Sequence, residues 1–128
     1  MSSGDVVALF AELASLPTPS GRERRAADRV AAYLRELGLA VVEDDAATRI
    51  DGNAGNLLCR LPPTNGAGLP IFLCAHLDTV PPKGPIEPVV EDGLVRNAAG
   101  TILGADNKAA VAAMLEAVAI LVRERVLL

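Results

Sequence analysis

Residues 69–75, LPIFLCA, form a nearly continuous apolar segment and constrain the fold more than any other part of this 128-residue sequence. A short apolar run of this kind is typical of a β-strand that is covered on both faces. Such strands belong to domains in which helices pack against a sheet. The sequence therefore predicts one α/β domain, a layered sheet flanked by helices, with this strand inside it.

Two stretches ahead of this strand have the periodicity of amphipathic helices. In the first stretch, apolar residues recur at helical spacing: Val6, Leu9, Phe10, Leu13 and Leu16. Pro17 ends this helix. The turn PTPSGRE follows, and its Ser20 and Glu23 have the spacing of a capping box, which predicts the start of a second helix. That helix ends at Gly38 and carries its apolar face on Ala27, Val30, Ala31, Leu34 and Leu37.

The remaining segments complete the α/β pattern. Residues 39–45 and 55–61 are predicted strands, and residues 62–68, PPTNGAG, are a predicted loop. Residues 87–97 are predicted to form a hairpin around the favoured turn dipeptide Asp92-Gly93. The most apolar helix is expected from residue 106 to about residue 125.

Composition excludes several classes of function. A net charge of −4 and an aromatic content of 2% argue against nucleic-acid binding, which needs cationic side chains and stacking platforms. The longest apolar run, 109–122, is interrupted by Glu116 and is shorter than the ~20 residues that span a bilayer. The N-terminus lacks a signal-peptide pattern, so we expect a cytoplasmic protein without membrane contact. Cys59 and Cys74 are too few for a disulfide framework and are expected to be small buried residues.

His76, the single histidine of the chain, and Asp78 follow the apolar segment directly. Side chains two apart on a strand point to the same face, so this pair is expected at the carboxyl end of a buried strand. A lone histidine is often structural. An aspartate on the same face favours a metal site instead, because a metal-bound imidazole usually gives its other N–H to a carboxylate or carbonyl. No G-x-S-x-G element that would indicate a serine hydrolase is present.

A second polar stretch, GTILGADNKAA, occupies residues 100–110. It is not a phosphate loop, because Gly100 and Gly104 are too close together and no Ser or Thr follows Lys108. Asp106 precedes the long apolar helix, where a carboxylate can cap the helix or serve as a metal ligand. Both interpretations of Asp106 stay open on the residues alone.

The two polar stretches together resemble the metallopeptidase M20 family. The order HLDTVPP, a hairpin, and TILGADNKAA opening an alanine-rich helix is most similar to the peptidase T-like aminotripeptidases. The segments LPTPSGRERRAADRVAAYLRELG and GNLLCRLP resemble the family's first helices and its first central strand. The similarity covers nearly the whole sequence.

The resemblance implies roles for three residues. His76 would bind one zinc ion, and Asp106 would bridge two zinc ions by giving one oxygen to each. Asp78 would belong to the catalytic machinery by orienting His76. In such enzymes the peptide bond after the bridging aspartate is often cis, so a cis Asp106–Asn107 bond is expected.

The resemblance also shows what this sequence lacks. The family's mechanism needs a glutamate pair, another acidic ligand and a second histidine, whereas this chain has no Glu-Glu dipeptide and one histidine. Since each zinc takes about four ligands, His76 and Asp106 cannot complete two sites. We therefore interpret residues 1–128 as the N-terminal part of a zinc-dependent exopeptidase-like catalytic domain. In that interpretation, these residues do not include the lid or dimerisation domain or the C-terminal part of the catalytic domain.

Three functions remain as hypotheses. The first is zinc-dependent hydrolysis of short peptides by the whole enzyme, with this chain inactive by itself. The second is another M20 activity, a deacylase or a carboxypeptidase, and the third is a truncated module without catalysis. An apolar strand without its neighbours would expose apolar surface, so we also expect a homo-oligomer.

Overall fold

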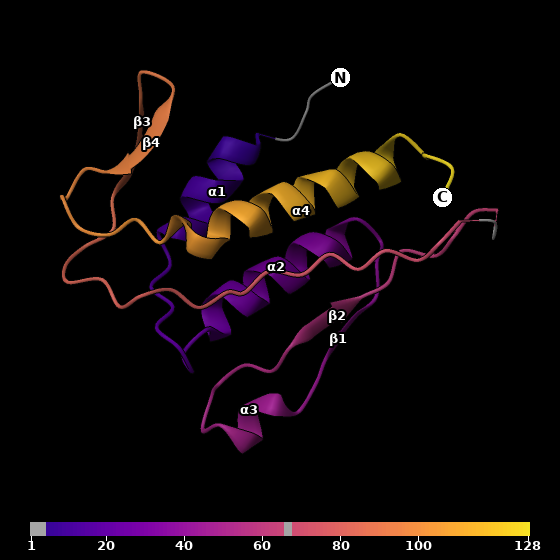
Figure 1. The fold of residues 1–128 in the computed structure, drawn as a ribbon, viewed down its shortest axis with the longest axis horizontal. Coiled ribbons are helices and arrows are strands. Elements are labelled where there is room, and N and C mark those ends of the chain that lie inside the picture. The colour runs from indigo at the N-terminus through magenta and orange to yellow at the C-terminus, as the bar shows by residue number, and fades with distance from the viewer. Residues whose placement is uncertain (1–4, 66–67) are drawn as a thin grey trace.

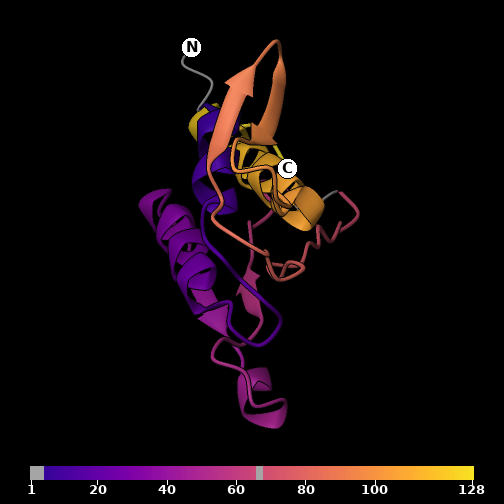
Figure 2. The same cartoon turned by 90° about the vertical axis from the view of Figure 1, so that its left-hand side faces the viewer.

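The computed structural model of the protein describes residues 5–65 and 68–128, so residues 66–67 of the predicted loop lie outside the described part. Its elements follow in the order α1 (Val6–Ala14), α2 (Arg24–Glu36), β1 (Val41–Glu43), α3 (Ala46–Arg49), β2 (Leu57–Cys59), β3 (Pro88–Glu91), β4 (Leu94–Asn97) and α4 (Ala105–Arg123). Helices α1, α2 and α4 lie together in Figure 1. The hairpin of β3 and β4 and the short α3 project from opposite ends in Figure 2.

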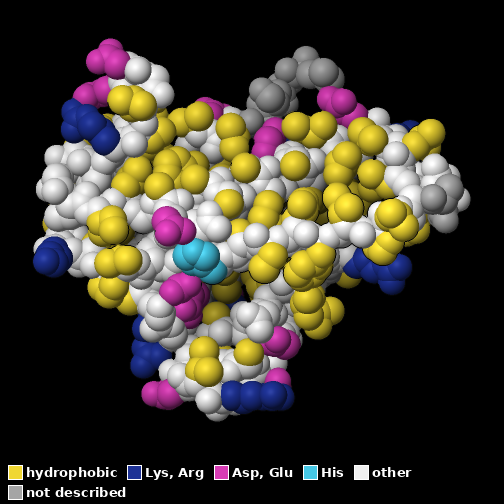
Figure 3. Space-filling view, viewed as in Figure 1, with side chains coloured by type: hydrophobic (Ala, Val, Ile, Leu, Met, Phe, Trp, Pro, Cys, Tyr) yellow, Lys and Arg dark blue, Asp and Glu magenta, His cyan; other side chains and the backbone are white. Residues whose placement is uncertain are grey.

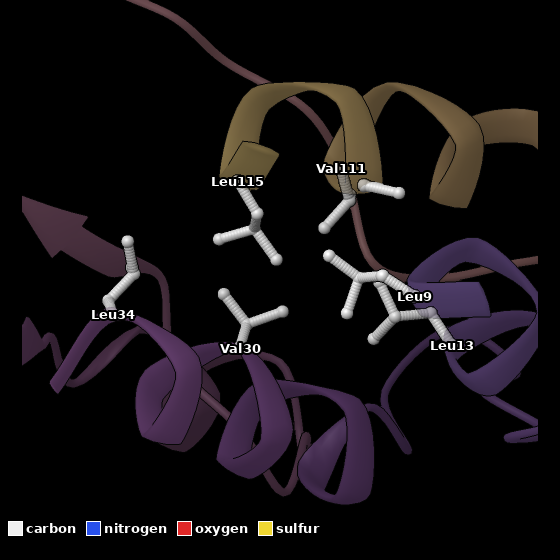
Figure 4. Packing of buried hydrophobic residues seen from close by; sticks show 7 residues of the cluster. Leu9, Leu13, Val30, Leu34, Val111 and Leu115 are labelled. Carbon is white, nitrogen blue, oxygen red and sulfur yellow. The ribbon is translucent and has the colours of Figure 1, made fainter. Parts of the chain in front are cut away.

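The hydrophobic core lies between the three long helices. Each helix contributes buried aliphatic side chains to one cluster: Leu9, Leu13, Val30, Leu34, Val111, Ala112 and Leu115. Figure 4 shows these side chains converging from α1, α2 and α4. The apolar faces predicted for α1 and α2 from helical spacing meet here against α4, so periodicity identified the part of the core that these two helices supply.

The helices predicted from the sequence are confirmed, with small shifts at their ends. Asp5 caps α1, since its Oδ1 accepts hydrogen bonds from the amides of Val7 and Ala8 at 3.1 and 3.0 Å. Gly38 follows α2 with φ of 81°, and the Leu39 amide donates to the carbonyl of Leu34 at 3.1 Å. A left-handed glycine after the last turn is a common helix ending, so the predicted C-cap is correct.

The predicted capping box at the start of α2 is wrong. The helix begins at Arg24, so Glu23 occupies the N-cap position that the prediction gave to Ser20, and it makes no side-chain cap. Gly21, with φ of 86°, turns the chain between the two residues. The Glu23 carboxylate accepts from the Gly21 amide at 2.6 Å, and the Ser20 hydroxyl donates to Asp78.

The strands form two separate antiparallel hairpins among the described residues. In the first, β1 pairs with β2 so that Val42 lies opposite Leu58. In the second, Val90 of β3 lies opposite Val95 of β4. The intervening Asp92 and Gly93 have φ of 51° and 76°, as a two-residue turn of the predicted kind requires. The four-residue α3 between β1 and β2 was not predicted.

The predicted strand at residues 69–75 is not formed. Figure 1 shows this segment crossing the molecule in extended form without a strand arrow. Leu69, Ile71 and Phe72 are 93%, 83% and 80% exposed, and no described residue pairs with the segment in a ladder. A buried strand needs neighbouring strands and covering helices on both sides, and this part of the chain supplies neither.

The structure also bears on the expected burial of the two cysteines and on membrane-spanning helices. Cys59 and Cys74 are both exposed free thiols, so the expected burial of the cysteines is wrong. Cys74 belongs to the uncovered segment, and Cys59 is the last residue of β2, where it is exposed. Within residues 5–65 and 68–128, no helix has the length and apolar character needed to cross a membrane.

An ion pair joins α2 to the first hairpin and makes stability depend on pH. Hydrogen bonds from Arg24 and from the Gly55 amide lower the pKa of Glu43 to about 2. Because the folded-state pKa is the lower one, this stabilisation is present above pH ~4.5 and is lost as the pH falls towards 2. Because solvent screens this partly exposed ion pair, we expect it to contribute about 1 kcal/mol to the free energy of unfolding. Urea unfolding at several pH values should show the stability difference between the natural chain and Glu43→Gln shrinking in that window. A stability difference that stays constant with pH would contradict this expectation.

Candidate metal centre

His76 and Asp78 lie together, as their spacing predicted, although their segment is not a strand. The His76 Nδ1 is 2.9 Å from the backbone carbonyl oxygen of Asp78 and 3.0 Å from its Oδ1. Both of these atoms are acceptors, so they favour a proton on Nδ1. That arrangement leaves the lone pair of Nε2 directed away from Asp78.

Asp106 approaches His76 from the other side. Its Oδ1 lies 3.1 Å from the His76 Nε2, which joins two residues that are 30 positions apart. The alternative role as a helix cap is not observed, since Gly104 is the N-cap of α4 and no side chain caps it. Asp106 and Asn107 have non-helical dihedral angles before the regular helix, and the bond between them is cis, as expected.

Gly104 allows the start of α4 to approach the histidine segment. Its φ is 81°, and a Cβ added there would come within 3.1 Å of Thr79 Cγ2. Both conditions favour glycine over any other residue. This close contact holds Asp106, two residues later, beside the segment that carries His76 and Asp78.

The three side chains form an open site. Figure 3 shows the histidine at the surface with acidic side chains on either side. The side chains of His76, Asp78 and Asp106 are 51%, 37% and 94% exposed. A ligand could therefore reach the Nε2 of His76 and both oxygens of Asp106 directly.

The carboxylates change the proton affinity of the site. Partial desolvation acts to lower the pKa of His76, but its hydrogen bonds to the Asp78 carbonyl and to the carboxylates of Asp106 and Asp78 outweigh this and raise that pKa. The Ser20 hydrogen bond is the main cause that lowers the pKa of Asp78, against desolvation and together with His76. The site thus favours an ionised Asp78 next to a histidine that holds its Nδ1 proton.

Two buried side chains connect the loop after α1 to the two segments of the site: Thr18 in that loop and Lys108 at the start of α4. These contacts were not predicted from the sequence. Thr18 is fully buried, donates its hydroxyl to the Leu77 carbonyl at 2.8 Å, and accepts from the Thr79 amide at 2.8 Å. The fully buried Lys108, just after Asp106, donates from Nζ to the Leu16 carbonyl, and burial lowers its pKa to about 8. A lysine directly before the apolar run 109–115 was the available sequence signal for this second contact.

The donor set suits zinc in kind and falls short in number. Imidazole nitrogen and carboxylate oxygen are normal zinc ligands, and one carboxylate can serve two ions. Within the described residues, no three His, Cys, Asp or Glu side chains form a group that could hold a metal ion. His76 and Asp106 would therefore be two ligands of a zinc site that further residues would have to complete.

Known proteins are similar to this chain in sequence and in fold. No family model matches the chain. It is 38% identical over 117 residues to the uncharacterised protein YqjE of Bacillus subtilis (strain 168), covering 91% of this chain and 31% of that protein. It is 35% identical over 123 residues to the cytosol non-specific dipeptidase of Escherichia coli K12, covering 87% of this chain and 24% of that protein. It is 35% identical over 92 residues to the succinyl-diaminopimelate desuccinylase of Corynebacterium glutamicum, covering 72% and 23%.

Two solved structures superpose on nearly all of the chain. Aminopeptidase PepT from Bacillus cereus ATCC 10987 matches with a TM-score of 0.89 and 33% identity, over 98% of this chain and 34% of the enzyme. A tripeptidase from Staphylococcus aureus subsp. aureus mu50 matches with a TM-score of 0.87 and 32% identity, with the same coverage. The chain thus spans about a third or less of the proteins that it matches.

The fold is that of the N-terminal part of a peptidase domain of the α/β class, so the predicted class is confirmed. The resemblance to the M20 family and its peptidase T-like members is likewise confirmed. The M20 family hydrolyses peptides and related amides and is generally metal-dependent.

Proposed function

We propose that residues 1–128 form part of the catalytic domain of a peptidase T-like zinc aminopeptidase that acts on short peptides. The observation that carries this proposal is the convergence of His76, Asp78 and Asp106, with the Nε2 of His76 within 3.1 Å of the Asp106 carboxylate. Matches to a PepT aminopeptidase and a tripeptidase support the peptide substrate. The Escherichia coli relative is named a cytosol dipeptidase, which supports a cytoplasmic location.

Each residue of the site has a defined task in this proposal. His76 would bind zinc through Nε2, and Asp78 orients the imidazole by accepting a hydrogen bond from its Nδ1–H. Asp106 would hold the metal with its carboxylate, as the ligand that two zinc ions share. When bound, zinc supplies Lewis acidity towards the peptide carbonyl. The general-base glutamate and the remaining ligands are provided by residues outside this segment, so we expect the chain alone to be inactive.

Two other functions remain in view. The match to a desuccinylase favours, as the second candidate, an M20 enzyme that removes an acyl group from an amine. A third candidate, a module without catalysis, is supported because residues 5–65 and 68–128 contain no group of three His, Cys, Asp or Glu side chains that could hold a metal ion. A panel of tripeptides, acylated amino acids and C-terminal substrates, assayed with the whole enzyme, separates the first two. Failure of the chain to bind zinc would favour the third.

Zinc titration of the purified chain tests the proposal. We expect His76→Ala and Asp106→Asn each to weaken zinc binding by about a hundredfold or more, because losing a ligand exceeds the ten- to hundredfold effect of losing its hydrogen-bond partner. The matched control is Asp28→Asn, an exposed carboxylate paired with Arg24 on α2. Equal zinc affinity in the natural chain and in His76→Ala would contradict the proposal.

A further inference from the structure

Ser20 makes a contact that its sequence position does not suggest. It does not cap α2, and its hydroxyl instead donates to Oδ2 of Asp78, 58 residues further along the chain. Asp78 uses its other oxygen, Oδ1, for the Nδ1 of His76 at 3.0 Å. One carboxylate therefore connects the Ser20 hydroxyl to the histidine through its two different oxygens.

The loop that carries Ser20 is fixed against the histidine segment. Pro19 and Thr79 form a parallel bridge, and the Thr79 amide donates to the Thr18 carbonyl at 2.8 Å. Thr18 and Thr79 are 0% and 5% exposed, so these bonds are protected from water. Ser20 consequently approaches Asp78 from an anchored backbone, and its hydroxyl can hold the carboxylate in one orientation.

The orientation of the Asp78 carboxylate affects which nitrogen of His76 carries the proton. Two acceptors of Asp78 face Nδ1 at 2.9 and 3.0 Å, whereas one oxygen of Asp106 faces Nε2 at 3.1 Å. The first pair favours the Nδ1–H tautomer, and the Asp106 oxygen favours Nε2–H. Without the Ser20 bond, the terminal torsion of Asp78 is broad and Oδ1 can turn towards water. The balance then moves towards Nε2–H, which blocks the atom that would bind metal.

We infer that Ser20 is a positioning residue that holds Asp78 so that the Nε2 of His76 is free of its proton and available for zinc. The inference rests on the proposed function for its purpose. The hydrogen bonds on which it depends join protein atoms alone, so it can be tested without zinc.

The tautomer of His76 is the decisive measurement. Because His76 is the single histidine of the chain, long-range ¹H–¹⁵N spectra of the neutral imidazole contain one set of ring signals. We expect mainly Nδ1–H in the natural protein, a larger Nε2–H fraction in Ser20→Ala, and a larger one still in Asp78→Asn. Ser20→Thr, which keeps the hydroxyl, should restore the natural spectrum. Ser15→Ala, which removes a hydroxyl that donates to the Glu12 carbonyl on α1, is the matched control and should not change it.

Zinc affinity provides a second readout. Ser20→Ala should weaken zinc binding about tenfold, the lower end of the range for outer-shell partners, because the Asp78 carbonyl still accepts from Nδ1. An unchanged tautomer in Ser20→Ala, beside a changed one in Asp78→Asn, would overturn the inference. If the natural chain binds no zinc, the proposed function fails, while the tautomer comparison still decides the role of Ser20.

Discussion

The Gly55→Ala substitution is expected to destabilise the protein by about 2–3 kcal/mol, the cost of forcing atoms into a packed site. A Cβ at this position would lie 2.1 Å from the Asp44 carbonyl oxygen and 2.8 Å from Oδ1 of the same residue. The first neighbour is backbone, so a side-chain rotation cannot relieve the overlap. The strands β1 and β2 must separate at this point.

Separation of these strands removes several hydrogen bonds at once. The Gly55 amide donates to the Glu43 carboxylate at 2.8 Å, and the Asn56 amide donates to Oδ1 of Asp44 at 2.8 Å. Thermal unfolding followed by circular dichroism measures the loss. Gly68→Ala is the matched control, since a Cβ there would have no neighbour within 4 Å, and it should change stability by at most about 0.5 kcal/mol. Similar melting of both variants would contradict the account.

The 128-residue chain is expected to self-associate through the uncovered segment 69–73. Leu69, Ile71 and Phe72 are each at least 80% exposed and lie next to one another. Soluble monomers rarely expose contiguous apolar side chains of this size, and an extended segment also presents unpaired backbone groups. Light scattering should give a mass above 13.2 kDa that rises with protein concentration.

Charged substitutions locate the contact. The Ile71→Lys/Phe72→Lys double variant should shift the protein towards the monomer, because burial of two ammonium groups opposes association. Leu94→Lys alters a side chain that is 69% exposed on the second hairpin, and it should leave the mass distribution unchanged. A monodisperse monomer of the natural chain at every concentration would refute the expectation.

The sequence predicted elements whose cause is local. The faces of α1 and α2 follow from helical spacing, and the turn at Asp92 and Gly93 follows from their tolerance of positive φ. The segment 69–75 was predicted wrongly because a buried strand depends on neighbours that its own residues do not encode. Ser20 was misassigned for the same reason: a local capping pattern competed with a distant acceptor on Asp78.

The site was predictable in part. Spacing placed His76 and Asp78 on one face, and the extended backbone of their segment preserves that relation. No local pattern could place Asp106 beside His76, and that contact was expected through the family resemblance alone. The contacts of Thr18 and Lys108 were not predicted because the partners of both side chains are backbone carbonyls, which the sequence does not mark.

The central claim is that His76 and Asp106 bind zinc, and X-ray absorption at the zinc edge of the zinc-loaded chain tests it most directly. We predict nitrogen and oxygen ligands at about 2.0–2.1 Å, with an imidazole contribution that is lost in His76→Ala. The exposed thiols of Cys59 and Cys74 are the competing donors in this chain. Sulfur ligands at about 2.3 Å, or an imidazole contribution that survives the substitution, would contradict the claim.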